Sequence, residues 1–171
     1  MTTREELLSK IPNNPNIEAL QPTDFLLKYI NKLLHNLALF VEPDINVLEI
    51  TKTSSYAADH ELMQKIIGIP SAYTAVDGEQ DVLTEFAEKY SHMGVTAYDD
   101  LAKEVILDFL NLHNGLFVVD LSKEDSIELS LEPPIQEDTD FSLRMGHITA
   151  IPVQFSFGKL TFLLIELDLT D

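Results

Sequence analysis

The sequence contains no cysteine and few cations: 11 Lys and Arg stand against 29 Asp and Glu, which gives a net charge of −18 at pH 7. Without cysteine, disulfide frameworks, thiol nucleophiles and thiolate metal sites are all excluded. The shortage of cations argues against nucleic-acid binding, because contact with phosphates needs clustered Lys and Arg. Anionic membrane surfaces are disfavoured for the same reason. We therefore expect neither nucleic acid nor a membrane among the partners of this protein.

Signatures of cofactor binding and of nucleophilic catalysis are also missing. The six glycines are too scattered for a phosphate-binding loop, and no serine lies in a G-x-S-x-G elbow. No two of the five histidines are four residues apart, the spacing that suits zinc when a carboxylate lies between them. Asp59, His60 and Glu61 are consecutive, so their side chains point apart on either a strand or a helix. We expect no cofactor and no metal site in the chain itself.

Long hydrophobic runs are absent as well. Residues 1–10, MTTREELLSK, carry charges where a signal peptide has its apolar core. The longest apolar runs, such as residues 160–165, are far shorter than the roughly 20 residues that span a bilayer. A cytoplasmic protein is expected. Its 171 residues, 45% of them hydrophobic, suit one domain with a sizeable core.

The N-terminal half combines a lead-in, a helix and strands. Residues 1–22 hold three of the eight prolines, and we expect a tail or irregular lead-in there, before a single domain over 23–171. Residues 24–40 place apolar side chains at helical spacing and predict an amphipathic helix. Residues 45–53 alternate, and residues 64–76 are rich in Ile, Val, Tyr and Thr, so both predict strands, one of them bent or at an edge.

Two consecutive helices are predicted next. Residues 79–93 place their apolar side chains on one face and stop at Gly94. Residues 96–99 form a candidate capping box for a second helix over 97–114, which would end at Gly115.

The remainder of the chain predicts strands. Residues 126–132 alternate, and residues 141–157 and 160–169 flank Gly158-Lys159, a candidate two-residue hairpin turn. Together with the preceding elements, this order predicts an α+β fold with an antiparallel or mixed β-sheet and helices packed on one face.

The second of these helices carries an unusual polar stripe. In residues 105–112, VILDFLNL, only Asp108 and Asn111 are polar, and their spacing of three places them on one helix face. Glu104 and Gly115 extend this stripe in the two directions. The simplest interpretation is the solvent-facing side of an amphipathic helix. A carboxylate beside a carboxamide can also do chemistry, because the carboxylate grips a cation while the amide orients a water.

The stripe resembles the motif of the CheX/CheC family of chemotaxis phosphatases. That family carries [D/S]-x-x-x-E-x-x-N on a helix, followed at a distance by a proline. Here Glu104-x-x-x-Asp108-x-x-Asn111 occupies the same frame, and Pro133-Pro134 follow at the family's spacing. The order of elements also resembles CheX over about residues 23–168.

The resemblance implies a substrate and a role for each residue. The substrate would be a phosphorylated CheY-type response regulator, into whose active site Asn111 would insert to orient the attacking water. Asp108 would hold the regulator's active-site lysine, with Glu104 in support. Mg²⁺ would belong to the regulator, so the chain would need no cofactor. A homodimer paired through sheet strands is also implied, and the C-terminal hairpin offers an edge for it.

Departures from the family motif keep other functions open. Glu104 stands where Asp or Ser is usual, and Asp108 replaces a Glu, so its carboxylate reaches about 1.5 Å less far. Residues 85–88 of the preceding helix echo the motif with Glu88 in place of Asn, so we expect one site at most. The main alternative is a non-catalytic adaptor that binds a response regulator or a flagellar switch component. A small-molecule-binding domain is a further alternative, although no polar cluster converges for it.

Overall fold

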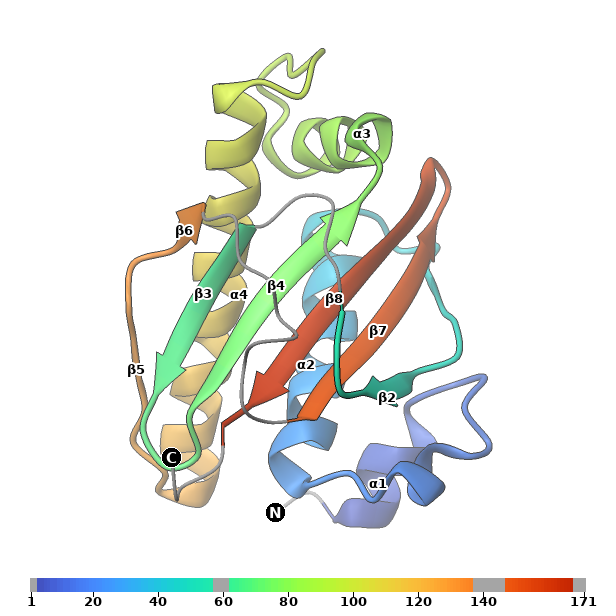
Figure 1. Ribbon diagram of the computed structural model, residues 1–171, viewed down its shortest axis with the longest axis vertical. Coiled ribbons are helices and arrows are strands. Elements are labelled where there is room, and N and C mark those ends of the chain that lie inside the picture. The colour runs from blue at the N-terminus through green and yellow to red at the C-terminus, as the bar shows by residue number, and fades with distance from the viewer. Residues whose placement is uncertain (1–2, 57–61, 137–146, 168–171) are drawn as a thin grey trace.

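A computed structural model describes residues 3–56, 62–136 and 147–167 (Figure 1). Its helices are α1 (Arg4–Ser9), the 3-10 helix η1 (Ile17–Leu20), α2 (Asp24–Phe40), α3 (Gln80–Ser91) and α4 (Asp100–Asp125). Its strands are β1 (Asn46–Val47), β2 (Thr51–Thr53), β3 (Leu62–Ile67), β4 (Ala72–Gly78), β5 (Ser130–Leu131), β6 (Ile135–Gln136), β7 (His147–Phe155) and β8 (Gly158–Glu166).

The described strands form one antiparallel sheet in the order β1-β7-β8-β4-β3-β5, with β2 also paired to β7 and β6 to β3. Helices α2 and α4 lie against one face of this sheet, and α3 crosses near its upper end in Figure 1. The predicted α+β class is confirmed, and the sheet is antiparallel rather than mixed. The predicted helices over 24–40 and 79–93 correspond to α2 and α3.

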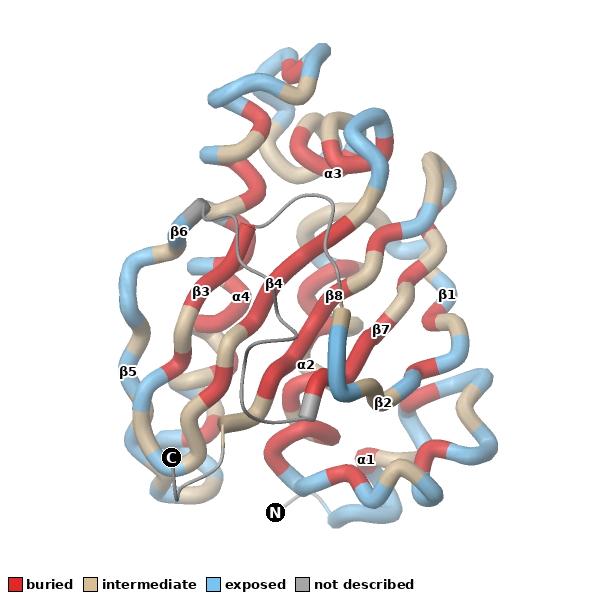
Figure 2. The backbone as a smooth tube through the Cα atoms, viewed as in Figure 1, coloured by how far each residue is buried: buried red, intermediate tan, exposed pale blue. Residues whose placement is uncertain are grey.

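Strands β4 and β8 are buried along most of their length (Figure 2). The buried side chains of the sheet form two clusters, one on each face. On the helix side, Val76, Phe162 and Ile151 stand in register across β4, β8 and β7 and join the core formed with α2, α3 and α4. On the opposite side, Ala75 and Leu163 belong to a second, smaller buried cluster. The sheet is therefore a buried central layer, and the helices are fixed to it by apolar contact.

Helix α4 differs from its prediction at both ends. Its N-cap is Asp99, whose side chain accepts a hydrogen bond from the Ala102 amide at 3.0 Å, so the expected capping box at 96–99 is wrong. The helix also continues through Gly115 to Asp125. A mid-helix glycine costs only about 1 kcal/mol relative to alanine, and burial of Phe117 and Leu121 beyond it outweighs that.

The strand predictions hold in outline, with corrections to their limits. The expected strand over 45–53 is divided into β1 and β2, because the Ile50 amide between them bonds to the Asn14 side chain at 2.7 Å. Of residues 126–132, only Ser130–Leu131 pair as a strand, since the Ile127 amide returns to the end of α4. The hairpin turn is Ser156-Phe157 rather than Gly158-Lys159, because Phe155 pairs directly with Gly158. Residues 141–146 lie outside the described part.

The expected edge for homodimer formation does not exist at the C-terminal hairpin. Strand β8 lies between β4 and β7, and β7 pairs on its other side with β1 and β2. Both strands of the hairpin are thus central strands, whose backbone groups are already paired. This removes the reason for expecting a dimer through that hairpin.

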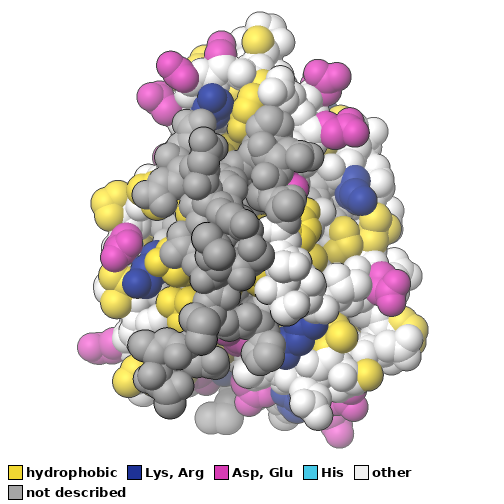
Figure 3. Space-filling model, viewed as in Figure 1, with side chains coloured by type: hydrophobic (Ala, Val, Ile, Leu, Met, Phe, Trp, Pro, Cys, Tyr) yellow, Lys and Arg dark blue, Asp and Glu magenta, His cyan; other side chains and the backbone are white. Residues whose placement is uncertain are grey.

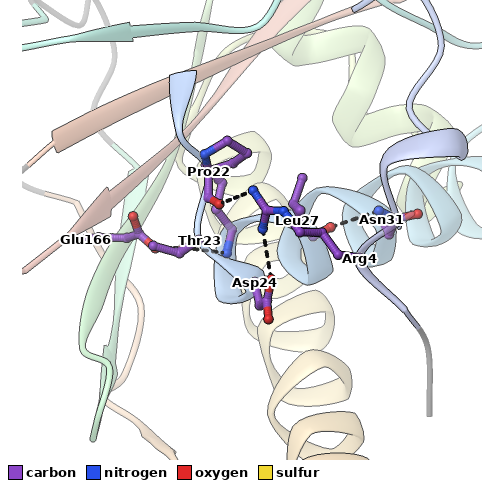
Figure 4. A network of polar contacts seen from close by, with 8 residues as sticks. Arg4, Pro22, Thr23, Asp24, Leu27, Asn31 and Glu166 are labelled. Atoms are coloured by element: carbon purple, nitrogen blue, oxygen red, sulfur yellow. Dashed lines mark hydrogen bonds and ion pairs between the residues drawn. The ribbon is translucent and has the colours of Figure 1, made fainter. Parts of the chain in front are cut away.

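The N-terminal segment packs onto the same core as the rest of the chain, and polar contacts join it to α2 (Figure 4). Arg4 donates to the Asp24 carboxylate at 2.9 Å and to the Pro22 carbonyl at 2.8 Å, where α2 begins. Asn31 donates from α2 to the Leu7 carbonyl of α1 at 3.0 Å. Three apolar side chains of the segment are buried with the main core: Leu7, Ile11 and Ile17.

Among the described helices, α4 alone is long and apolar enough to cross a membrane by length and composition. Its buried side chains include Ala102, Ile106, Phe109 and Leu110, which are fully enclosed by the sheet and the other helices. Burial of this kind is typical of a core helix in a folded domain.

A histidine is enclosed in the core beside α2. His113 of α4 is fully buried, and its Nδ1 lies 2.9 Å from Asn36 Nδ2, which must donate to it. The other ring nitrogen, Nε2, has no hydrogen-bond partner among the described residues. Burial, with a smaller contribution from the charge of Lys32, lowers the pKa of His113 from 6.5 to about 3. The ring is therefore neutral in the fold and protonates on unfolding at mildly acidic pH.

The first prediction concerns this histidine and the pH dependence of stability. The unfolded chain binds one more proton than the fold between the two pKa values, so the free energy of unfolding falls as pH drops from 6.5 towards 3. His113→Gln should remove this slope above about pH 5, where carboxylates contribute little. Urea unfolding at several pH values measures it. The exposed His35→Gln serves as control, and an unchanged slope in His113→Gln would contradict the assignment.

The second prediction compares two glycines. Gly158 has φ +143°, and a Cβ there would lie 2.6 Å from Val82 Cγ2 of α3, whereas a Cβ at Gly115 would meet nothing within 4 Å. Gly158→Ala should cost about 1–3 kcal/mol of unfolding free energy through overpacking. Gly115→Ala should instead stabilise α4 by up to about 1 kcal/mol. Urea denaturation of both variants tests the pair, and equal effects would refute it.

Candidate functional site

The polar stripe of α4 is accessible, as the sequence predicts. Glu104, Asp108 and Asn111 are all exposed, whereas Phe109 and Leu110 between them are fully buried. Side chains three or four residues apart on a helix point to the same side, so burial of one face exposes the other. The stripe is held on a rigid element whose opposite face lies in the core.

The carboxylate of Asp108 is held from the α3 side. The Tyr90 hydroxyl donates to Asp108 Oδ2 at 2.8 Å, and the Tyr90 ring packs edge-on against Phe109 with centroids 5.4 Å apart. Partial burial, the hydrogen bond to Asp108 and the negative charge of that carboxylate all raise the pKa of Tyr90, so the phenol stays protonated and remains a donor. Asp108 is thus drawn towards α3 in the free protein.

The amide of Asn111 is held from the opposite side, by the sheet. Gln64 Nε2, on β3, donates to Asn111 Oδ1 at 2.8 Å and to the Glu132 carbonyl at 2.9 Å. Glu132 directly precedes Pro133-Pro134, so one buried glutamine connects the two separated parts of the motif that the sequence suggests. Asn111 Nδ2 has no partner among the described residues and remains available.

Gln64 was missed by the sequence analysis. Its only signal is a polar residue at an inward position of the strand Leu62–Ile67, where Leu62 and Ile66 on the same face are fully buried. A buried amide at such a position requires hydrogen-bond partners on the elements that pack against it. The sequence indicates the need for partners but not their identity.

Glu104 and Asp108 border a groove between α3 and α4, about 550 Å³ in volume. Apolar side chains dominate its lining, and two of them are unusually open to solvent: Met93 is 62% exposed and Leu101 36%. Neither carboxylate forms an ion pair with any described residue. Figure 3 shows further acidic side chains around the outline of the molecule, including its upper end near α3. A cation is therefore the electrostatic complement of this region.

Residues 85–88 of α3, which repeat part of the motif, have a structural role. The Glu88 carboxylate accepts a hydrogen bond from the Val95 amide and so fixes the loop between α3 and α4. Phe86 and Phe109, at equivalent places in the two helices, meet edge-on with centroids 5.1 Å apart. With Glu88 engaged in this way, α3 offers no counterpart of the Asp108 and Asn111 pair.

The chemistry that this surface offers is electrostatic and orienting. Within residues 3–56, 62–136 and 147–167, no group of three His, Asp or Glu is arranged to hold a metal ion. Asp59, His60 and Glu61 lie outside the described residues. The stripe presents a carboxylate acceptor and an amide donor, and it contains no nucleophilic side chain beside a base.

Comparisons by sequence find nothing: no family model and no curated protein matches the chain. Solved structures do resemble it. A CheC-like superfamily protein from Shewanella sp. PV-4 matches with a TM-score of 0.70 at 13% identity, over 86% of this chain and 99% of that one. CheX from Desulfovibrio desulfuricans matches with a TM-score of 0.66 at 12% identity, over 84% and 99%. A chain of the CheX-CheY-BeF3-Mg²⁺ complex from Borrelia burgdorferi matches with a TM-score of 0.64 at 14% identity, over 86% and 100%.

These matches cover nearly the whole of each solved chain, so the likeness extends over the complete domain and not only over one motif. At such low identity they describe the backbone arrangement of helices and sheet. The chain has the fold of the CheX/CheC-like chemotaxis proteins.

Proposed function

We propose that this domain removes the phosphoryl group from the aspartyl phosphate of a CheY-type response regulator. The observation that carries the proposal is the exposed pair Asp108 and Asn111 on the rigid helix α4, with the Asn111 amide already oriented by Gln64. Support also comes from the similarity in fold to a chain of a solved CheX-CheY complex. A cytoplasmic location follows for a partner of such a regulator.

In the proposed reaction, α4 enters the regulator's active site and Asn111 orients a water for in-line attack on phosphorus. The P–O bond to the regulator's aspartate breaks, its carboxylate leaves with the bonding pair, and the water's proton passes to solvent. Positioning and electrostatics dominate such a transfer, so no nucleophile is needed on this chain. Mg²⁺ is held by the regulator's own residues.

Asp108 supplies the contact to a cation of the partner. A carboxylate accepts a charge-assisted hydrogen bond from a lysine ammonium, and no described cation neutralises Asp108 in the free protein. Glu104, one turn earlier, adds negative charge beside it. The shorter reach of aspartate requires α4 to dock more deeply than a helix with glutamate at this position.

A non-catalytic adaptor is the second candidate, and the state of Asp108 favours it. Its side chain is one methylene shorter than the glutamate of the family motif and is already hydrogen-bonded to Tyr90. A displacement near 1 Å lowers rates by roughly 10²-fold, so binding to a regulator can persist without phosphatase activity.

A homodimer remains a proposal from the resemblance alone, and light scattering of the purified chain tests it.

The third prediction tests Asn111. Asn111→Ala should lower the rate of regulator dephosphorylation by roughly 10²-fold, because it removes the group that orients the water. The unfolding free energy should fall by about 1–3 kcal/mol, because the buried Gln64 Nε2 loses one of its two acceptors. Phosphate release from a phosphorylated regulator with Mg²⁺ measures the rate. The exposed Asn16→Ala, whose side chain makes no cap hydrogen bond, is the control.

The fourth prediction tests Asp108. Asp108→Glu restores the glutamate of the family motif and its extra reach, so dephosphorylation should be maintained or accelerated. Asp100→Glu, an exposed change of the same kind in the first turn of α4, should leave the rate unaltered. If the wild type and Asp108→Glu both leave the regulator's own decay unchanged across several regulators, the phosphatase proposal fails and the adaptor takes its place.

A further inference from the structure

We propose that Gln64 is a positioning residue that holds the Asn111 amide in the orientation used for catalysis. This inference rests on the proposed function for its role in the reaction, but the hold itself is a property of the free protein. Gln64 lies fully buried on β3, a strand that α4 packs against.

Every hydrogen-bonding group of the Gln64 side chain is used. Its Nε2 donates to Asn111 Oδ1 and to the Glu132 carbonyl, at 2.8 and 2.9 Å. Its Oε1 accepts from Asn114 Nδ2 at 2.8 Å. Two of these partners lie on α4 and the third in the segment between β5 and β6. A side-chain amide held by three such bonds cannot rotate without leaving a buried polar group unpaired.

Asn114 fixes which way round the Gln64 amide lies. Its Nδ2 donates to Thr74 Oγ1 at 2.9 Å as well as to Gln64, and both residues are buried. The Thr74 hydroxyl in turn donates to the Gln64 backbone carbonyl at 3.1 Å. Because Asn114 must donate to Gln64, Gln64 must present its oxygen there and its nitrogen to Asn111.

The fixed orientation of Gln64 also fixes the orientation of the Asn111 amide at the surface. Its Oδ1 accepts from Gln64, so its Nδ2 points away from the sheet, without a partner among the described residues. Among the described residues, a single donor bonds to Oδ1, so its second lone pair has no partner there. An exposed asparagine normally samples several rotamers, but this one has a fixed amide plane before any partner arrives. Such preorganisation raises the rate of a step that depends on water placement.

A purely structural role for Gln64 makes a different prediction. If it only satisfies the Glu132 carbonyl and Asn114, its loss destabilises the fold and leaves the chemistry of folded molecules unchanged. A positioning role lowers kcat in molecules that remain folded and still bind the regulator, so KM and kcat separate the two.

The fifth prediction uses Gln64→Met, which keeps the length of the side chain and removes its hydrogen bonds. With the phosphorylated regulator as substrate, kcat should fall roughly 10- to 100-fold while KM stays within about twofold. Ile66→Ala, at an equally buried position on the same face of β3, is the matched control. It should lose stability without a comparable loss of kcat. An unchanged kcat in Gln64→Met, or an equal loss in Ile66→Ala, overturns the proposal.

A second measurement needs no regulator. The side-chain amide of Asn111 should give ¹⁵N relaxation typical of a rigid group in the wild type and of a mobile group in Gln64→Met. A mobile amide in the wild type overturns the proposal whatever the activity. A rigid amide released in the variant, in a protein without phosphatase activity, supports the hold by Gln64 and refutes the proposed function instead.

Discussion

The hydrogen bonds between Gln64, Asn114 and Thr74 join α4 to the sheet, and the geometry of the polar stripe depends on them. Apolar packing fixes how far α4 lies from the strands, but it is non-directional and specifies rotation about the helix axis weakly. Buried amides can form their hydrogen bonds in a single orientation, so they fix the rotation of the helix about its axis. Asn114, one turn beyond Asn111, is fully buried, so it also fixes which side chains of α4 face outward.

Much of this fold follows from patterns in the sequence. Helical spacing predicts α2 and α3 closely, and alternation predicts most of the sheet, because burial of one face leaves a clear period. The end of α4 could not be predicted in this way. Gly115 is a stop signal by local propensity, and only the packing of Phe117 and Leu121 against distant elements overrides it. Likewise, the turn at Ser156-Phe157 depends on a strand register that local residues do not determine.

The site is predictable in part for the same reason. The exposed side chains Asp108 and Asn111 follow from helical spacing, since a helix with one buried face must expose the other. Their supports do not follow, because Tyr90 and Gln64 lie 18 and 47 residues away and reach the site through tertiary packing. The two supports also act in opposite directions, one drawing Asp108 towards α3 and the other holding Asn111 towards β3. Asp108 and Asn111 lie on the same helix face, but Tyr90 and Gln64 therefore hold their side chains apart.

Because Tyr90 already donates to Asp108, a partner that binds this carboxylate can exchange one hydrogen-bond donor for another. A lysine that takes the place of the Tyr90 hydroxyl at Asp108 Oδ2 gains there only the difference between two hydrogen bonds and not the whole of one. A charged donor wins at that oxygen, because the attraction between opposite charges adds to its hydrogen bond, whereas the phenol bonds the same carboxylate without that attraction. A neutral donor gains little from it. Tyr90 thus disfavours partners that offer only uncharged donors to Asp108. It also keeps the exposed Asp108 carboxylate hydrogen-bonded when no partner is bound.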